Sequence, residues 1–151
     1  MLNPKVDEHP KLAIPPENTL IASNFDLLPK DDASSAVPKL IKQWEGCTDL
    51  WYKKDDKFEK PKTFVNMNLY TNDSLFGLNP QARAFSHLWK EVVDEYLREF
   101  NYMASEAKLD FSIGIAYDRL SFKWSGFNHK LPELINEMIQ RVLDMKNQNI
   151  E

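Results

Sequence analysis

His87 and Glu91 are the residues whose types and spacing come closest to metal chemistry. They stand four positions apart in His87-Leu88-Trp89-Lys90-Glu91, so on a helix they would share one face. Zinc helices of the H-E-x-x-H or H-x-x-E-H type carry two histidines and a glutamate on such a face. Only one histidine is present here, and zinc takes at least three protein ligands. We therefore predict a surface pair and no metal site.

The remaining candidate nucleophiles and ligands lack partners in the sequence. Cys47 is the only cysteine, which excludes an internal disulfide and a thiolate zinc site, favours a reducing compartment and suggests a chemically inert thiol. His9 and His129 have no second ligand nearby, and we expect His129 to cap or flank the last helix. No serine lies in a G-x-S-x-G motif, and with four glycines a glycine-rich phosphate loop is excluded.

Two charged stretches also predict solvated surface rather than a binding site. In the first, lysines alternate with acids, which is typical of a solvated loop or an interdomain salt-bridge patch. Its members are Lys53, Lys54, Asp55, Asp56, Lys57, Glu59, Lys60 and Lys62. The second, on the polar side of an expected helix, consists of Asp94, Glu95, Glu99 and Glu106. We predict no catalytic, cofactor-binding or metal-binding residue in this chain.

The amino-acid composition limits the kinds of partner and the cellular location that we expect for this protein. The 151 residues suit one domain, and 42% are hydrophobic and 28% charged. A net charge of −4 argues against nucleic acid as the main partner. No apolar run is long enough for a membrane span, and the first ten residues lack a signal core. We expect a cytoplasmic protein.

The first 47 residues predict an extended, proline-rich connector. They hold six of the nine prolines, which disfavour long helices before Pro38. Residues 18–29 are too apolar for a solvated tail and predict extended chain lying on another surface. Residues 30–38 are typical of a flexible loop.

The rest of the chain predicts an α+β unit over residues 48–151. Residues 48–54 are a plausible strand, and residues 62–71 alternate with period two, which places Val65 and Met67 on one face and Phe64 and Asn66 on the other. Residues 109–117 and 120–125 alternate again and predict an antiparallel hairpin with one buried face.

Two amphipathic helices are expected to pack on this antiparallel sheet. The first opens at Asn79-Pro80, a good N-cap followed by a first-turn proline, and continues to about Lys108. Its apolar stripe consists of Phe85, Leu88, Trp89, Val92, Val93, Tyr96, Leu97, Phe100 and Met103. The second helix follows the turn at residues 126–130, starts at Pro132 and carries Leu131, Leu134, Ile135, Met138, Val142 and Met145 on one face. Helices packed on an antiparallel sheet make an α+β fold.

Four collinear stretches resemble the insulin-degrading enzymes of the pitrilysin or insulinase family of zinc metalloendopeptidases. Residues 15–29 are similar to the family's P-x-x-N-x-(F/L)-I-x-(T/S)-N-F-x-(I/L)-L-P. Residues 50–62 resemble L-W-(F/Y)-K-(Q/K)-D-D-K-F-x-x-P-K. Residues 99–107 resemble a helix end reading E-x-x-Y-x-A-x-x-A, and residues 126–132 resemble the turn G-(F/Y)-N-(D/E)-K-x-P, with His129 where an acid is usual.

The resemblance implies which part of such an enzyme is present. Full members have four α+β domains in two halves that enclose a chamber, and the zinc motif lies in the first domain. By this resemblance, residues 12–29 correspond to the end of the second domain, 30–47 to the linker between halves, and 48–145 to the first part of the non-catalytic third domain. No zinc ligand or catalytic residue of the family falls within this span.

We therefore expect a non-catalytic middle-domain segment of an insulinase-type metalloendopeptidase, in the form of a fragment or truncated chain. It would help wall the peptide-degrading chamber and join the two halves, with zinc bound outside this segment. Its partners would be the remainder of the peptidase and, through the full enzyme, peptide substrates. The alternative is a stand-alone, catalytically inactive interaction or scaffold module derived from the family. On either reading the chain alone is expected to be inactive.

Overall fold

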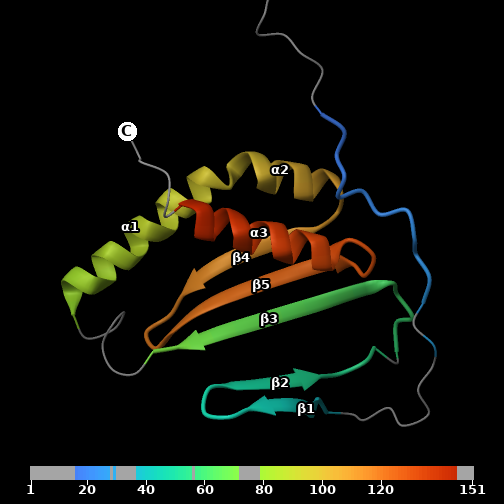
Figure 1. Ribbon diagram of the computed structural model, residues 1–151, viewed down its shortest axis with the longest axis horizontal. Helices are drawn as coiled ribbons and strands as arrows, with labels where there is room; N and C mark the ends of the chain where they lie inside the picture. The colour runs from blue at the N-terminus through green and yellow to red at the C-terminus, as the bar shows by residue number, and fades with distance from the viewer. Residues whose placement is uncertain (1–15, 28, 30–36, 56, 72–78, 146–151) are drawn as a thin grey trace, which may run out of the picture.

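The computed structural model describes residues 16–27, 29, 37–55, 57–71 and 79–145, which form two antiparallel sheets and three helices (Figure 1). The strands are β1 (Lys39–Trp44), β2 (Thr48–Tyr52), β3 (Lys62–Tyr70), β4 (Asp110–Ile115) and β5 (Arg119–Phe127). The helices are α1 (Pro80–Tyr96), α2 (Arg98–Glu106) and α3 (Leu131–Met145). This arrangement confirms the predicted α+β class.

The main sheet has the strand order β3-β5-β4, and all of its strands are antiparallel. β5 lies in the centre because it pairs with β4 through a short turn and with β3 in an unbroken register from Lys62↔Phe127 to Tyr70↔Arg119. The helices cover one face of this sheet (Figure 1). Phe122 and Trp124 are buried on that face, as the alternation predicted.

The first predicted helix is divided into α1 and α2. Asn79 caps α1 as expected, since its side chain accepts a hydrogen bond from the Gln81 amide at 2.9 Å and Pro80 follows it. The prediction of one continuous helix to about Lys108 was wrong, because Leu97 adopts ψ 2° and interrupts the helical geometry. Leu97 is nevertheless buried in the core.

The apolar stripe of this helix is wider than its contact with the core. Val93, Leu97 and Phe100 are buried, whereas Phe85 and Leu88 are 69% and 60% exposed. The sheet and α3 therefore cover only part of the predicted stripe. A helix buries only the part of its stripe that a neighbour reaches.

The core lies between the sheet and the three helices. It continues onto α3, whose Leu131, Leu134 and Met138 are buried as the predicted stripe required. Its buried members are Leu20, Val93, Leu97, Phe100, Ala104, Ala107, Leu109, Ile113, Phe122, Trp124, Leu131, Leu134 and Met138. Leu20 comes from the proline-rich segment, so this core includes a residue from outside the predicted α+β unit.

The second sheet is the hairpin β1–β2, and it lies apart from the main sheet on the β3 side (Figure 1). All eleven residues of its two strands are exposed. β1 lies within residues 1–47, where the sequence predicted only extended connector. The register shift between Leu40 and Lys42 interrupts the side-chain alternation by which a strand is identified.

In the described part of the chain, no helix combines the length and the apolar character needed to cross a membrane.

Candidate binding groove

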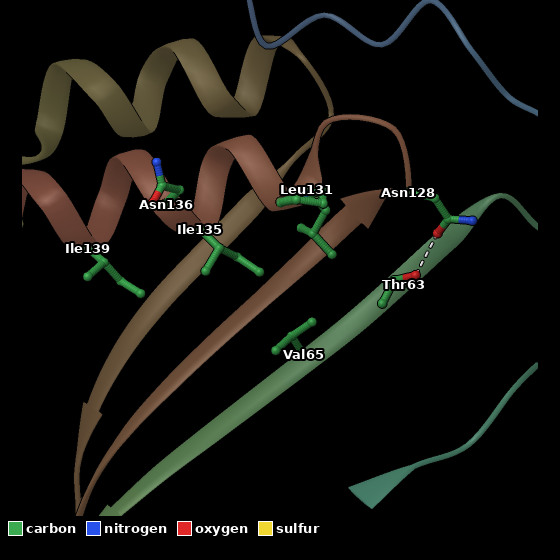
Figure 2. Close-up of a pocket in the computed structure, with 8 residues that line it drawn as sticks. Thr63, Val65, Asn128, Leu131, Ile135, Asn136 and Ile139 are labelled. Carbon is green, nitrogen blue, oxygen red and sulfur yellow. Dashed lines mark hydrogen bonds between the residues drawn. The ribbon is translucent and has the colours of Figure 1, made fainter. Parts of the chain in front are cut away.

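An open groove of about 390 Å³ runs between β3 and α3 (Figure 2). β3 is one of the two outer strands of the main sheet, and α3 packs on its neighbour β5. The residues that line the groove are Thr63, Val65, Asn128, Leu131, Pro132, Ile135, Asn136 and Ile139. A volume of this size falls within the range of about 300–1,000 Å³ that small-molecule sites occupy.

The periodicities of the strand and of the helix explain which side chains line the groove. Val65 points toward α3 because alternate residues of a strand share one face. Leu131, Ile135 and Ile139 are four residues apart, so they form one row on α3. In Figure 2 the strand and the helix diverge from the Thr63 end toward Ile139, which makes the groove a wedge.

The narrow end of the wedge is closed by a polar contact. The Thr63 hydroxyl donates a hydrogen bond of 2.6 Å to the Asn128 side-chain oxygen (Figure 2). The Asn128 amide nitrogen donates to the Pro61 carbonyl at 2.9 Å, so the turn after β5 is tied to the start of β3. Both bonds therefore lie in the turn just before α3, which begins at Leu131.

No lining residue carries a charge. Two ion pairs lie along α3. Lys130, just before the helix, pairs with Glu133 at 2.7 Å, and Arg141 pairs with Glu137 at 2.6 Å. The groove therefore offers apolar surface with hydroxyl and amide groups at its edges. Such a lining can bind apolar side chains. It contains no acid or base for general acid–base catalysis, and the Thr63 hydroxyl donates to the Asn128 amide oxygen rather than to a base that could activate it.

The predicted surface pair lies on α1, and neither residue lines the groove. His87 and Glu91 are both exposed. Across the described ranges there is no cluster of three or more His, Cys, Asp or Glu side chains that could hold a metal ion. On the same helix, Asp94 accepts a hydrogen bond from Lys90 and thereby raises the pKa of that ammonium group. The polar face of α1 is thus solvated surface.

His129 has a role that the sequence did not predict. Its Nδ1 accepts hydrogen bonds from the backbone amides of Ser23 and Asn24, each at 3.3 Å. The expectation that it caps or flanks α3 missed this contact, because the two amides lie more than a hundred residues away in sequence. Nearby, Phe25 contacts Phe127 edge-on at 4.9 Å between ring centroids.

Residues 16–27, which we term the N-terminal strap, are fixed at a second point by Asn18. The Asn18 side-chain amide donates to the Met103 carbonyl at 2.7 Å, and its oxygen accepts from the Leu20 amide at 3.1 Å. Leu20 is 1% exposed and lies in the core. The strap therefore lies on another surface, as its apolar residues predicted.

The remaining candidates lie on the surface. Cys47 is a free, exposed thiol whose sulfur accepts a hydrogen bond from the Thr48 hydroxyl at 3.6 Å. Lys57, Lys60 and Lys62 are exposed, as expected for a solvated loop. Asp55 shapes that loop by accepting bonds from the backbone amides that follow it. His9 and Asp56 lie outside the described residues.

Comparisons with known proteins place the whole chain in one group. Residues 2–151 match the family described as the middle or third domain of peptidase M16. Insulin-degrading enzyme-like 2 of Arabidopsis thaliana is 33% identical over 131 residues, which cover 87% of this chain and 13% of that protein. Human insulin-degrading enzyme is 28% identical over 136 residues, covering 90% and 13%. Mouse nardilysin is 32% identical over 134 residues, covering 88% and 11%.

A solved structure shows the same fold. The crystal structure of pitrilysin superimposes with a TM-score of 0.76 and 20% identity, over 87% of this chain and 14% of pitrilysin. The chain thus spans between about one-ninth and one-seventh of the length of these relatives.

Proposed function

This chain belongs to the peptidase M16 family as its middle or third domain, and we propose that it is a non-catalytic part of an insulinase-type zinc metalloendopeptidase. The observation that carries the proposal is the match to that domain along residues 2–151. The fold shared with pitrilysin agrees with it.

The residues present do not fit the family's zinc. The chain contains no H-x-x-E-H sequence, and the nearest approach to one, His87 with Glu91, is an exposed pair without a third ligand in the described part of the chain. Zinc would therefore be bound elsewhere in the peptidase. No step of peptide hydrolysis is assigned to this chain.

The proposed role is architectural. As in the expectation from sequence, the α+β unit would form part of the wall of a peptide-degrading chamber, and the preceding residues would join the two halves of the enzyme. The strap supports this proposal, because Asn18, Leu20 and His129 fasten the connecting segment directly to the unit. A segment fixed in this way would transmit movement of one half to the other as the chamber opens and closes.

The partners follow from the same proposal. They are the remainder of the peptidase and, through the complete enzyme, peptide substrates. A cytoplasmic location remains a prediction from the N-terminal sequence.

Elemental analysis combined with a peptidase assay tests the proposal. We expect the purified chain to contain well under one zinc per molecule and to leave a fluorogenic peptide intact, with and without added zinc. One zinc per chain, or hydrolysis that a chelator abolishes, would contradict it. A matched His87→Ala variant controls for weak surface binding of zinc.

A further inference from the structure

The second half of the strap is held by a hydrogen-bond acceptor that a proton can remove. The amides of Ser23 and Asn24 both donate to Nδ1 of His129, each at 3.3 Å. A ring nitrogen accepts only while it carries no hydrogen, so this geometry requires a neutral imidazole with its hydrogen on Nε2. In the described part of the chain, His129 is the only hydrogen-bond acceptor for these two amides.

The first half of the strap is held by groups that do not titrate. The Asn18 side chain donates to the Met103 carbonyl at 2.7 Å, and Leu20 is buried in the core. Neither an amide nor an alkyl side chain changes its charge between pH 5 and 8. Protonation of His129 would therefore leave this half in place.

Residues 23–27 have few contacts that would replace the bonds to His129. All five residues are exposed. Phe25 meets Phe127 edge-on at 4.9 Å, whereas the Asp26 amide bonds within the strap, to the Asn24 side-chain oxygen. Exposed segments with few buried contacts open at a low free-energy cost. The two bonds to one imidazole therefore make a large share of the attachment of residues 23–27.

The charged groups around His129 leave its ring free to gain a proton. The charged residues on the neighbouring elements are Glu17 and Asp26 of the strap, Lys62 of β3, Glu106 of α2, Lys108 before β4, Lys130 in the turn and Glu133 of α3. Lys130 pairs with Glu133. Across the described ranges none of these groups forms an ion pair with His129. The ring is exposed, so it exchanges protons directly with water.

We propose that His129 is a pH-sensitive latch, which holds residues 23–27 of the strap on the α+β unit at pH 8 and releases them at pH 5.5. Histidine is the side chain that ordinarily changes charge between pH 5 and 8. Protonation takes a proton from solvent and places it on Nδ1, where two amide hydrogens already point. Two attractive contacts thus become repulsive. The hold is present while the ring is neutral and is lost as the pH falls.

Limited proteolysis of the whole chain tests the latch. Thermolysin would be used to cut the Asn24–Phe25 bond, with the product measured by mass spectrometry at pH 8 and pH 5.5. Each rate is divided by the rate for a free peptide of residues 16–27 at the same pH, which removes the protease's own pH dependence. Cleavage of a transiently opened segment tracks its open population. We expect the ratio to rise about three- to tenfold from pH 8 to pH 5.5.

Three variants identify the titrating group. In His129→Asn the side-chain oxygen replaces Nδ1 as an acceptor that does not titrate, so the cleavage ratio should stay low at both pH values. In His129→Ala the acceptor is absent, and the ratio should be high at both. Asp26→Asn removes the nearest acid of the strap and should keep the full rise of the wild type.

A measurement on the unaltered protein tests the geometry directly. Two-bond ¹H–¹⁵N NMR spectra distinguish the imidazole tautomers, and at pH 8 we expect the His129 hydrogen on Nε2. A hydrogen on Nδ1 at pH 8 would overturn the proposal. So would a wild-type cleavage ratio that is equal at the two pH values, or a rise that persists in His129→Ala. The proposed function fails separately, by zinc content and peptide hydrolysis, so the two results are distinguishable.

Discussion

Leu20 offers the sharpest test of how the strap is held. Its side chain is 1% exposed, and replacement by alanine removes Cγ and the two Cδ methyl groups, three carbon atoms in all, from the core. At about 0.8 kcal/mol for each group the lost transfer free energy is about 2.4 kcal/mol, and the cavity left behind adds to it. We therefore expect Leu20→Ala to lower the free energy of unfolding by about 2.5–4 kcal/mol.

The adjacent residue is a matched control. Ile21 is also a branched aliphatic residue of the strap, but it is 58% exposed. Surface substitutions usually stay within about 0.5 kcal/mol, so Ile21→Ala should change little. Urea denaturation followed by tryptophan fluorescence measures both, and a loss of 3 kcal/mol lowers the midpoint by about 1.5 M at a slope of about 2 kcal/mol per M.

Equal effects of the two substitutions would contradict the conclusion that Leu20 anchors the strap in the core. If Leu20→Ala and Ile21→Ala had the same midpoint, within about 0.2 M on the same slope, Leu20 would contribute nothing to the core. The strap would then be a passive connector, and its proposed mechanical link to the α+β unit would fall.

The other predictions concern single positions. Gly126 has φ 148°, and a Cβ there would lie 2.3 Å from the Leu109 side chain, so Gly126→Ala should lower the free energy of unfolding by about 2–4 kcal/mol. At Gly46 nothing lies within 4 Å of an added Cβ, so Gly46→Ala should cost only about 1 kcal/mol. Equal urea midpoints for the two variants would contradict this prediction. His129→Ala removes the acceptor for two backbone amides and should cost about 0.5–1.5 kcal/mol, with limited proteolysis of the strap accelerated; unchanged cleavage would count against that contact. The buried Trp124 indole N–H has no hydrogen-bond partner among the described residues, so Trp124→Phe should cost less than about 1.5 kcal/mol in thermal unfolding. A loss above about 3 kcal/mol would show that the N–H is bonded.

The sequence predicted those helices and strands in which neighbouring residues show a clear periodicity of apolar side chains or a specific capping motif. The β4–β5 hairpin was predicted because large and small side chains alternate strictly around a short turn. The start of α1 was predicted because Asn79 and Pro80 are specific to a helix N-terminus. The break at Leu97 was not predicted, since no proline or glycine stands there. β1 was missed because the shift between Leu40 and Lys42 disrupts its period.

The sequence predicted the two walls of the groove separately, but not that they lie side by side. The face of β3 that holds Val65 and the stripe of α3 that holds Ile135 were both identified from sequence, but their meeting depends on β3 pairing with β5, sixty residues away. The residues joined by the bonds between His129 and the strap are more than a hundred positions apart in sequence. No local propensity encodes such contacts, because they arise from the packing of the whole core.

Size-exclusion chromatography with light scattering tests the central claim, that this chain is a middle domain made to join a peptidase. The 17.7 kDa chain would be run alone and mixed with a separately expressed catalytic half from a full-length relative. The account predicts that the catalytic half gains 17.7 kDa and that the chain alone shows no larger species. Separate elution of the two proteins at unchanged masses, over micromolar to tens of micromolar concentrations, would contradict it.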